Sequence, residues 1–556
     1  MSAIWLLLLA LIGFVVAHLT YGRTVAGWLG MVEERKTPAH ELNDGVDYVP
    51  AKPAVLLGHH FASIAGAAPI IGPATALAFG WMPVYLWILI GGVFIGAVHD
   101  FASLMASIRH QGKSIGEVVE AYVGHTGKTL FLVFSYSTLI LVVAVFTIVV
   151  AKTFVDVPQA ATSSVLFILL AVGFGLALYR FKAPLLIATI VGVALLFACL
   201  VFGNLFPLRL SFNAWVAILL AYVFVASVTP VWVLLQPRDY LNSFLLYAMM
   251  ALGLVGIVAA NPTVQAPAFT SVHVEGLGYL FPVLFVTVAC GAISGFHSLV
   301  SSGTTAKQLD RETDARTVGY GAMLIESLLA VVALIAVASL TGDRYQAFMA
   351  KGGAGPVAAF SVGLGELIAA LGLPAQTMSN FVALAVSAFA LTSLDTATRL
   401  SRFAFQEFFE PRRVAGEPAR PSPFLARNRY VGTTISVVLA GALAYSGTWK
   451  QIWPIFGSAN QLLAALALLA VTAWLGHRAR QNAFVKIPMV FMFAVTLTSL
   501  GALARDHLFG ANPSYVLGAV AVLLLGVALV LAGLSFKVLA RRGPATEQGS
   551  GPAASS

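Results

Sequence analysis

The sequence predicts an all-α polytopic membrane protein, and three observations lead to this prediction. Of the 556 residues, 59% are hydrophobic and only 10% are charged, whereas a soluble domain is typically about 25% charged. Apolar runs of roughly 20 residues, the length of a helix that crosses a bilayer, recur along the chain. Two of these runs are interrupted by Gly, Pro, His and Ser residues, which an ordinary membrane-spanning helix does not need.

We expect fifteen membrane spans. In chain order they cover about residues 3–20, 55–80, 82–107, 129–151, 161–180, 183–203, 213–235, 240–260, 279–302, 318–340, 376–396, 430–447, 452–474, 487–504 and 514–536. The first has no basic residues before it and no small-residue cleavage site after it, so we interpret it as a retained helix rather than a signal peptide. Cys199 and Cys290 lie inside apolar runs and indicate neither a disulfide framework nor a zinc motif.

The distribution of Lys and Arg predicts the orientation. With fifteen spans, 26 of the 32 Lys and Arg residues fall on the side that holds the 21–54 loop. Because basic residues concentrate in cytoplasmic loops, we expect a bacterial inner-membrane protein with its N-terminus outside and its C-terminus in the cytoplasm. The net charge of +9 then reflects topology, which argues against nucleic-acid binding. The Gly-rich apolar stretch 354–372 is interpreted as a re-entrant or interfacial helix on the outer face.

The interrupted runs are Gly58–Pro73 and Cys290–Gly303. The first contains three Gly, two Pro and two adjacent His, and the second contains three Gly, four Ser and one His. Gly and Pro release backbone groups from the helical ladder, and in lipid these groups need other partners. Unwound backbone at membrane depth is tolerated where it lines a cavity, which in secondary transporters is the binding site.

Each interrupted run lies in the first span of a group of five, residues 55–203 and 279–474, and corresponding spans of the two groups run in opposite directions. We therefore predict a LeuT-type 5+5 inverted repeat with broken first and sixth core helices plus about five peripheral helices. The other segments are an N-terminal peripheral helix with a cytoplasmic loop (1–54), two inserted helices (204–278), two C-terminal peripheral helices (475–542) and a disordered tail (543–556).

Several stretches resemble the carbon starvation protein A (CstA) family. They are Asn43–Pro50, Gly58–Ala62, Ala65–Pro69 with Gly72 and Pro73, Gly295–Thr305, Gly319–Ser327, Leu391–Arg399 and Phe456–Leu462. The resemblance implies a membrane transporter that takes up peptides or pyruvate during nutrient limitation. It also implies a LeuT-type fold within the amino acid–polyamine–organocation (APC) superfamily, in agreement with the repeat. Because this chain is shorter than many members beyond the last motif, substrate preference transfers less well than fold.

The candidate substrate-binding residues lie at the two breaks. They are His59, His60, Ser63, Gly66 and Ala67 at the first break and Gly295, His297, Ser298 and Ser301 at the second. Histidine titrates near neutral pH and suits a substrate or proton site, and capping of freed carbonyls is the structural alternative. Free amides at the second break, with Ser302, Thr304 and Thr305 nearby, suit a carboxylate, although the hydroxyls can instead bond backbone carbonyls. Asn460 and Gln461 are either packing residues or cavity lining.

Thr392, Ser393 and Asp395 form a candidate ion site, and Asp100 and Glu326 are candidate coupling acids. Hard cations prefer such oxygen ligands, and similarity to LeuT-type sodium symporters implies hydroxyl ligands on this helix. Small hydroxyl residues are also common packing residues in membranes, and Arg399 is an alternative partner for Asp395. Acids inside spans are rare, and these two can carry a proton or pair with a cation.

These features predict an ion-coupled secondary transporter, not an enzyme, that imports pyruvate or short peptides by alternating access with H⁺ or Na⁺ and no cofactor. The rival hypothesis is a membrane-embedded, metal-dependent enzyme or sensor in which His59, His60, His99, Asp100 and His297 gather. No metal-binding spacing is present, so no metal ligand is assigned. A channel is a third hypothesis, and its sequence would more often show rings of charge. The expected partners are the small-molecule substrate and the bilayer, and the peripheral helices either form a homo-oligomer interface or serve as a scaffold.

Overall fold

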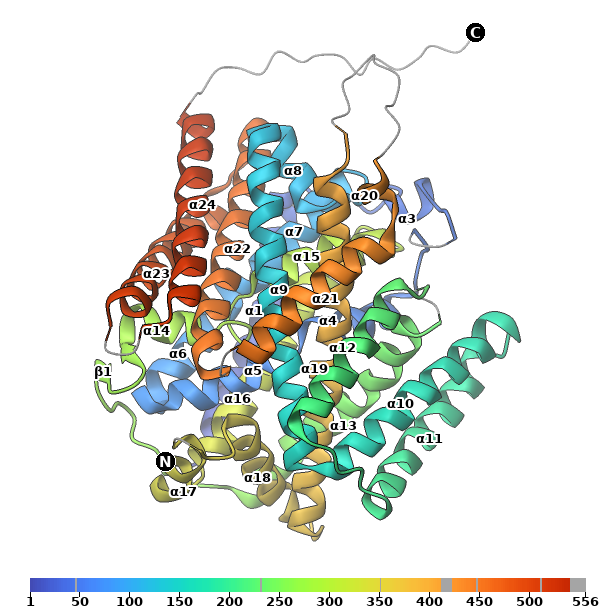
Figure 1. The fold of residues 1–556 in the computed structure, drawn as a ribbon, viewed down its shortest axis with the longest axis vertical. Coiled ribbons are helices and arrows are strands. Elements are labelled where there is room, and N and C mark those ends of the chain that lie inside the picture. Colours follow the sequence, from blue (N-terminus) through green and yellow to red (C-terminus); the bar gives the residue numbers. More distant parts are fainter. Residues whose placement is uncertain are drawn as a thin grey trace.

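The computed structural model describes residues 1–45, 48–230, 233–350, 352–411, 423–446, 449–510 and 513–540. The predicted tail 543–556 lies outside these residues. The described chain forms a bundle of helices with one two-stranded antiparallel hairpin, β1 (His273–Val274) and β2 (Gly278–Tyr279) (Figure 1). The prediction of an all-α, multi-pass membrane protein is therefore confirmed.

The helices of the first half cover most of residues 4–260. They are α1 (Ile4–Leu19), α2 (Tyr21–Leu29), α3 (Pro38–Glu41), α4 (Pro53–Ile64), α5 (Ala68–Ala76), α6 (Trp81–Gly91), α7 (Ala97–Arg109), α8 (Ile115–Val123), α9 (His125–Asp156), α10 (Pro158–Gly175), α11 (Leu185–Leu205), α12 (Phe212–Val228) and α13 (Leu235–Ala260). The π-helical turn Gly92–Gly96 joins α6 to α7, so the two form one continuous span.

The second half repeats the pattern of long apolar helices around one broken helix. Its helices are α14 (Leu280–Thr287), α15 (Gly295–Gly303), α16 (Ala322–Ala338), α17 (Gly342–Met349), α18 (Pro356–Ala369), α19 (Ala375–Phe408), α20 (Phe424–Arg427), α21 (Arg429–Ser446), α22 (Trp449–His477), α23 (Ala483–Phe509) and α24 (Tyr515–Ala540). The predicted re-entrant stretch 354–372 forms α18, which has 14 residues and is too short to cross a bilayer as a helix.

Eleven helices in the described chain are long and apolar enough to cross a membrane, and the bent pair of α4 and α5 makes a twelfth. The other three predicted spans fall on the 17-residue α12, on the less apolar α21, and on the interrupted pair of α14 and α15. Every predicted span thus corresponds to helix, but a count based on length and hydropathy gives eleven or twelve rather than fifteen. The predicted spans on α12 and on the α14/α15 pair included non-helical residues at an end or a break, whereas α21 matches its predicted span in length and is left out because it is less apolar.

The two broken helices lie side by side and antiparallel at the centre of the bundle. The first bends by 46° between α4 and α5. The second is interrupted between α14 and α15. α4 packs against α15, and α5 packs against α14. The halves of one broken helix therefore meet the opposite halves of the other, which brings the two unwound segments, both rich in Gly and Ala, close together.

Buried and lipid-exposed helices occupy different parts of the bundle. α9, α16 and α22 are buried along almost their whole apolar length, whereas α1 and α11 expose most of their apolar side chains. In Figure 1, α23 and α24 flank α22 on one side, and α10 and α11 lie on the opposite side. Such large exposed apolar surfaces need lipid around them.

Candidate functional site

The first break is held against α19 by a single close contact. Ser393 on α19 donates a hydrogen bond from Oγ to the backbone carbonyl of Ser63, the next-to-last residue of α4, over 3.3 Å. Gly66 lies in the unwound segment, and a Cβ atom at this position would be 2.7 Å from Ser393 Oγ. Only glycine allows the freed backbone to approach the serine this closely. Ala67 caps the start of α5 with its carbonyl, which accepts from the amides of Ile70 and Ile71.

The two adjacent histidines of α4 point to different partners. The Nδ1 atom of His60 is 2.8 Å from Thr305 Oγ1, so this residue connects α4 to the end of the second broken helix. The Nδ1 atom of His59 is 3.3 Å from an oxygen of Asp239 on α13. Both histidines are buried. The neighbouring Ser63 hydroxyl and His60 Nε2 are buried and have no hydrogen-bond partner among the described residues.

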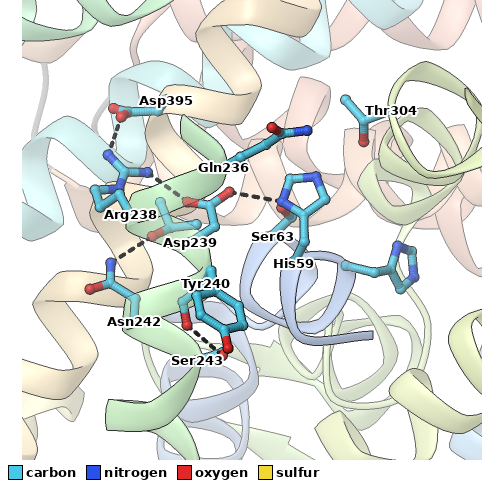
Figure 2. Close-up of polar contacts among 12 residues, drawn as sticks. His59, Ser63, Gln236, Arg238, Asp239, Tyr240, Asn242, Ser243, Thr304 and Asp395 are labelled. Atoms are coloured by element: carbon cyan, nitrogen blue, oxygen red, sulfur yellow. Dashed lines mark hydrogen bonds and ion pairs between the residues drawn. The ribbon is translucent and has the colours of Figure 1, made fainter. Parts of the chain in front are cut away.

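A buried chain of charged groups crosses from α4 to α19. Arg238 on α13 forms an ion pair with Asp395 on α19 through one guanidinium nitrogen and contacts Asp239 through another over 3.1 Å. Figure 2 shows Arg238 between the two carboxylates, with His59 beyond Asp239. Tyr222 on α12 adds a 2.7 Å hydrogen bond to Asp395. Two carboxylates thus share one arginine in the bundle interior, with a histidine at one end.

The arginine that pairs with Asp395 is Arg238, not the Arg399 that the sequence suggested. Arg399 lies four residues further along α19, and it donates to the backbone carbonyls of Ala226 and Thr229, each over 2.7 Å, at the end of α12. Positions four apart on a helix can pair, but here the end of α12 offers two free carbonyls to Arg399, and α13 offers Arg238 to Asp395. The hydroxyl of Thr392, another residue of the predicted ion site, is held in position by a 3.1 Å hydrogen bond that it accepts from Asn242 of α13.

The second break is stabilised from α22. A Cβ atom at Gly295 would be 2.2 Å from the carbonyl oxygen of Asn460, so α15 begins in direct backbone contact with α22. The side-chain oxygen of Asn460 accepts a 2.8 Å hydrogen bond from the amide of Phe296. This caps one of the free amides that the sequence offered to a substrate carboxylate. Gln461 donates to the carbonyl of Phe285 over 2.9 Å, so both α22 residues support the broken helix.

The serines of α15 divide between the two roles that the sequence left open. Ser298 donates to the carbonyl of Gly295 and Ser302 donates to the carbonyl of Ser298, each over 2.7 Å. These two hydroxyls therefore satisfy backbone carbonyls of their own helix. Thr304 likewise donates to the carbonyl of Val300. Ser301, in contrast, is fully buried with a hydroxyl that lacks a partner among the described residues. Among these residues Ser301 is therefore the stronger candidate for contact with a ligand or water.

A second buried polar group gathers between α7, α15 and α16. His99 Nδ1 is 2.7 Å from one oxygen of Asp100, and His297 Nδ1 is 2.8 Å from the other. The Nε2 atom of His297 lies 3.4 Å from Glu326 on α16. All four side chains are fully buried. The five residues of the rival metal hypothesis are therefore divided, because His59 and His60 belong to the first break, whereas His99, Asp100 and His297 form this group.

A polar cavity of about 600 Å³ reaches the end of α15 from the end of the bundle that carries α8. Its lining includes Ser302 and Gly303 together with ionic groups of α8, α9 and α19 and of the segments next to α8, α15 and α19. These charged residues are Lys113, Glu117, Glu120, Lys128, Lys307, Glu407 and Glu410. We call this cavity the α8 vestibule.

The charges of the α8 vestibule are organised around Lys128. Its ammonium group contacts Glu117 and lies 2.9 Å from Glu120 and 4.0 Å from Glu407. Partial burial by itself raises the pKa of Glu120, but hydrogen bonds from Lys128 and His125 outweigh it and hold that pKa below its ordinary value. The vestibule is therefore lined by paired charges next to the end of the second broken helix.

A membrane bundle with two broken helices paired at its centre, and with buried charged groups at the breaks, has the architecture of a membrane transporter. Comparison with known proteins supports this classification as a membrane transporter. The model of the family described as carbon starvation protein CstA matches residues 2–354 and 349–499. This chain belongs to that family, whose characterised relatives are transporters and not enzymes.

Three relatives illustrate the similarity. The chain is 34% identical to the peptide transporter CstA of Campylobacter jejuni, over 89% of this chain and 79% of the relative. It is 32% identical to the pyruvate/proton symporter BtsT of Escherichia coli, over 92% and 82% respectively. It is also 32% identical to the peptide transporter CstA of Bacillus subtilis, over 90% of both chains.

Among solved structures, the fold is similar to that of a mutant manganese transporter from Eremococcus coleocola. The TM-score is 0.53 with 14% sequence identity, and the alignment covers 90% of this chain and 98% of the other. At this identity the likeness concerns the fold alone.

Sequence reasoning missed the residues that α12 and α13 contribute. Arg238, Asp239 and Asn242 are buried and Tyr222 bonds Asp395, although the sequence had predicted α12 and α13 as two inserted helices outside the core repeats. An available signal was the adjacent Arg-Asp pair at the start of an apolar span, because two ionisable residues there need internal partners. Cys290 was placed inside an apolar run with no zinc motif, and its distance from Glu326 in the sequence hid their proximity.

Proposed function

We propose that this protein imports small carboxylated nutrients, such as pyruvate or short peptides, across the bacterial inner membrane by ion-coupled alternating access. The observation that carries the proposal is the antiparallel pairing of the two broken helices, with buried polar atoms of Ser63, His60 and Ser301 lacking partners among the described residues. Polar atoms of this kind are normally satisfied by a ligand, an ion or water. The relatives named for peptide and for pyruvate transport share the carboxylate as a chemical feature of their substrates.

The pairing of the broken helices also supports the LeuT-type 5+5 inverted repeat and membership of the APC superfamily. In such a repeat the first and sixth core helices run antiparallel and are unwound at the same depth. The packing of α4 against α15 and of α5 against α14 supports this assignment. Movement of one group of helices against the other would expose the breaks to alternate sides, and the α8 vestibule would be the inward route. The N-terminus would lie outside and the C-terminus in the cytoplasm.

A sodium ion would bind between α4 and α19. The carbonyl of Ser63 and the hydroxyl of Ser393 are already within 3.3 Å, and Thr392 lies one residue earlier on α19. Carbonyl and hydroxyl oxygens are the ligands that hard cations prefer, and in sodium symporters unwound carbonyls supply part of the site. Asp395 would contribute indirectly, because its pairing with Arg238 orients this part of α19.

A proton would instead be carried by His59 and Asp239. These side chains are 3.3 Å apart and buried, and Asp239 also contacts Arg238. A proton on His59 would therefore add a positive charge that competes with Arg238 for Asp239. The name of the Escherichia coli relative includes proton symport, which supports this alternative. The roles of Asp100 and Glu326 as coupling acids stay predictions from the sequence.

Uptake into proteoliposomes tests the proposal. Labelled pyruvate and a labelled dipeptide would be supplied under an imposed proton gradient, an imposed sodium gradient, or neither. We expect saturable uptake of one compound that depends on one gradient. A saturable flux without any dependence on either gradient would contradict ion coupling, and the absence of flux for both compounds would contradict the substrate class.

A further inference from the structure

Three buried side chains of different chemistry converge beside the second break. One donor atom each of Cys290, His297 and Glu326, a sulfur, a ring nitrogen and a carboxylate oxygen, lie within 4.8 Å of one another. The His297 and Glu326 atoms are 3.4 Å apart. Cys290 is 4% exposed, and the other two are not exposed at all. A thiol, an imidazole and a carboxylate thus share one small space inside the bundle.

The imidazole of His297 is held in the orientation that a metal ligand needs. Its Nδ1 atom is 2.8 Å from Asp100, and Asp100 is in turn held by His99 at 2.7 Å. A histidine that donates its Nδ1 hydrogen to a carboxylate presents the lone pair of Nε2, which here lies 3.4 Å from Glu326. Metal-ligating histidines almost always have such a carboxylate or carbonyl partner on the second nitrogen.

Among the described residues, the Cys290 thiol makes only long contacts, because it donates to Ser294 Oγ over 3.4 Å and accepts from the Asn460 amide over 3.8 Å. Neither oxygen of Glu326 has a hydrogen-bond partner there, and Nε2 of His297 has none either. An ionised carboxylate in a dry interior is strongly unfavourable unless a cation compensates it. No arginine or lysine among the described residues forms an ion pair with Glu326, whose partner is His297. The cluster therefore combines a buried carboxyl group with nitrogen and sulfur donor atoms within 4.8 Å of it.

We propose that Cys290, His297 and Glu326 bind a divalent transition-metal ion of the zinc type. Sulfur, nitrogen and oxygen donors in one tetrahedral set are characteristic of zinc, whereas magnesium and calcium take oxygen alone. Ser294 Oγ, 3.4 Å from the Cys290 sulfur, is in place to hold a fourth ligand such as water. Binding would displace the thiol proton, and any proton held by the Glu326 carboxyl group, because the thiolate and the carboxylate are the ligands.

The metal would connect the unwound segment to two helices. Cys290 lies between α14 and α15, His297 on α15 and Glu326 on α16. An ion bound to all three would fix the second break against α16 and would slow any transport that requires this break to move. It would also exclude proton carriage by Glu326 while bound. The inference rests on the donor atoms alone and does not depend on the proposed substrate.

Cobalt substitution tests the site in the purified full-length protein. Cobalt(II) bound to a thiolate gives a near-ultraviolet charge-transfer band, and the chain has only two cysteines. We expect this band in the wild type and its displacement by zinc. Cys199, on the partly exposed α11, supplies the matched control. Cys199→Ser should keep the band, Cys290→Ser should lose it, and Asp100→Asn should weaken cobalt affinity by about 10- to 100-fold.

The opposite results would overturn the inference. They are the absence of a band in wild-type protein at saturating cobalt, or its loss in Cys199→Ser but not in Cys290→Ser. If Cys290→Ser does not give a monodisperse protein, Cys199→Ser decides the question by itself, because a surviving band then requires Cys290. Elemental analysis provides a second readout, and less than one zinc per chain after incubation and gel filtration would also reject the site.

Discussion

Ser393 donates its hydroxyl hydrogen to the backbone carbonyl of Ser63 over 3.3 Å, and this contact joins α19 to the end of α4 at the first break. A cation between the two oxygens would replace the hydrogen bond by two coordination bonds. Without an ion, Ser63 and Ser393 link α4 to α19 by a hydrogen bond. With an ion bound, their two oxygens would serve as two of its ligands.

Ser393→Ala removes one oxygen ligand from the proposed sodium site. A hydrogen bond or ligand to a charged group contributes about 1.5–3 kcal/mol, so we expect the apparent sodium affinity of uptake to fall about 10- to 100-fold. Ser387→Ala is the matched control, because Ser387 is equally buried on α19 but bonds only the carbonyl of Leu384. Equal sodium dependence in wild type and Ser393→Ala would show that no sodium ion binds there.

Gly66→Ala tests the close approach at the first break. The added Cβ would lie 2.7 Å from Ser393 Oγ and 3.1 Å from the ring of Phe146, and overpacking of this kind typically costs about 1–3 kcal/mol. We expect a lower melting temperature and loss of uptake. The double variant Gly66→Ala/Ser393→Ala should recover part of the stability, because the serine oxygen is then absent.

Gly173→Ala is the control for the glycine substitution. Gly173 lies in α10, where an added Cβ meets no described atom within 4 Å. Replacing glycine by alanine in a helix favours folding by roughly 0.5–1 kcal/mol, so this variant should melt at the wild-type temperature or slightly above it. If Gly66→Ala behaves in the same way, the close contact with Ser393 has no energetic consequence.

Asp395→Asn breaks a buried ion pair and leaves the Arg238 charge with Asp239 alone. Removing one partner of such a pair is expected to destabilise the protein by about 3–5 kcal/mol. Arg238→Met/Asp395→Leu removes both charges and should be less destabilised than the single variant. Thermal unfolding of the three proteins in detergent measures the difference. A double variant less stable than Asp395→Asn would mean that Arg238 stabilises the bundle mainly through other contacts.

His59→Gln separates the two roles proposed for His59. If His59 carries the coupling proton with Asp239, the variant should lose uptake driven by a proton gradient but keep exchange of internal for external substrate. Exchange requires binding and movement but no net proton transfer. Loss of both activities would assign His59 to substrate binding instead. Wild-type proton-driven uptake in the variant would rule out either role.

Lys128→Met removes the cation that organises the α8 vestibule. In the wild type, hydrogen bonds from Lys128 and His125 hold the pKa of Glu120 below its ordinary value of about 4.3, so this stabilisation is present at neutral pH. It is lost as the pH falls through the lowered pKa. We therefore expect the variant to melt well below the wild type at pH 7, with a gap that narrows toward pH 4.

The control for this variant is Lys113→Met. Lys113 is half-exposed and 3.9 Å from Glu117, an arrangement that typically contributes only about 0–1 kcal/mol. Its melting temperature should stay near that of the wild type at every pH. A difference in melting temperature between Lys128→Met and wild type that widens as the pH falls would contradict the expected pH dependence.

The sequence by itself determined the membrane character, the elements and the two breaks. Apolar runs produce helices in a bilayer because the backbone has no other way to satisfy its hydrogen bonds there. Gly and Pro mark the places where that ladder is interrupted, which is why Gly66 and Gly295 were recognised from local composition alone. Ser63, Ser393 and the family membership were also within reach of the sequence, the last through its ordered motifs.

Tertiary structure decided which polar residues meet. Asp395 could pair with Arg399 on its own helix or with a residue from elsewhere, and only the packing of α13 against α19 selects Arg238. Cys290, His297 and Glu326 are brought together by the contact of α15 and the unwound segment with α16. Side-chain pairing across helices depends on rotation, depth and crossing angle, none of which is specified by hydropathy or spacing along one helix. For this reason the sequence could identify the breaks, but the folded bundle determined what surrounds them.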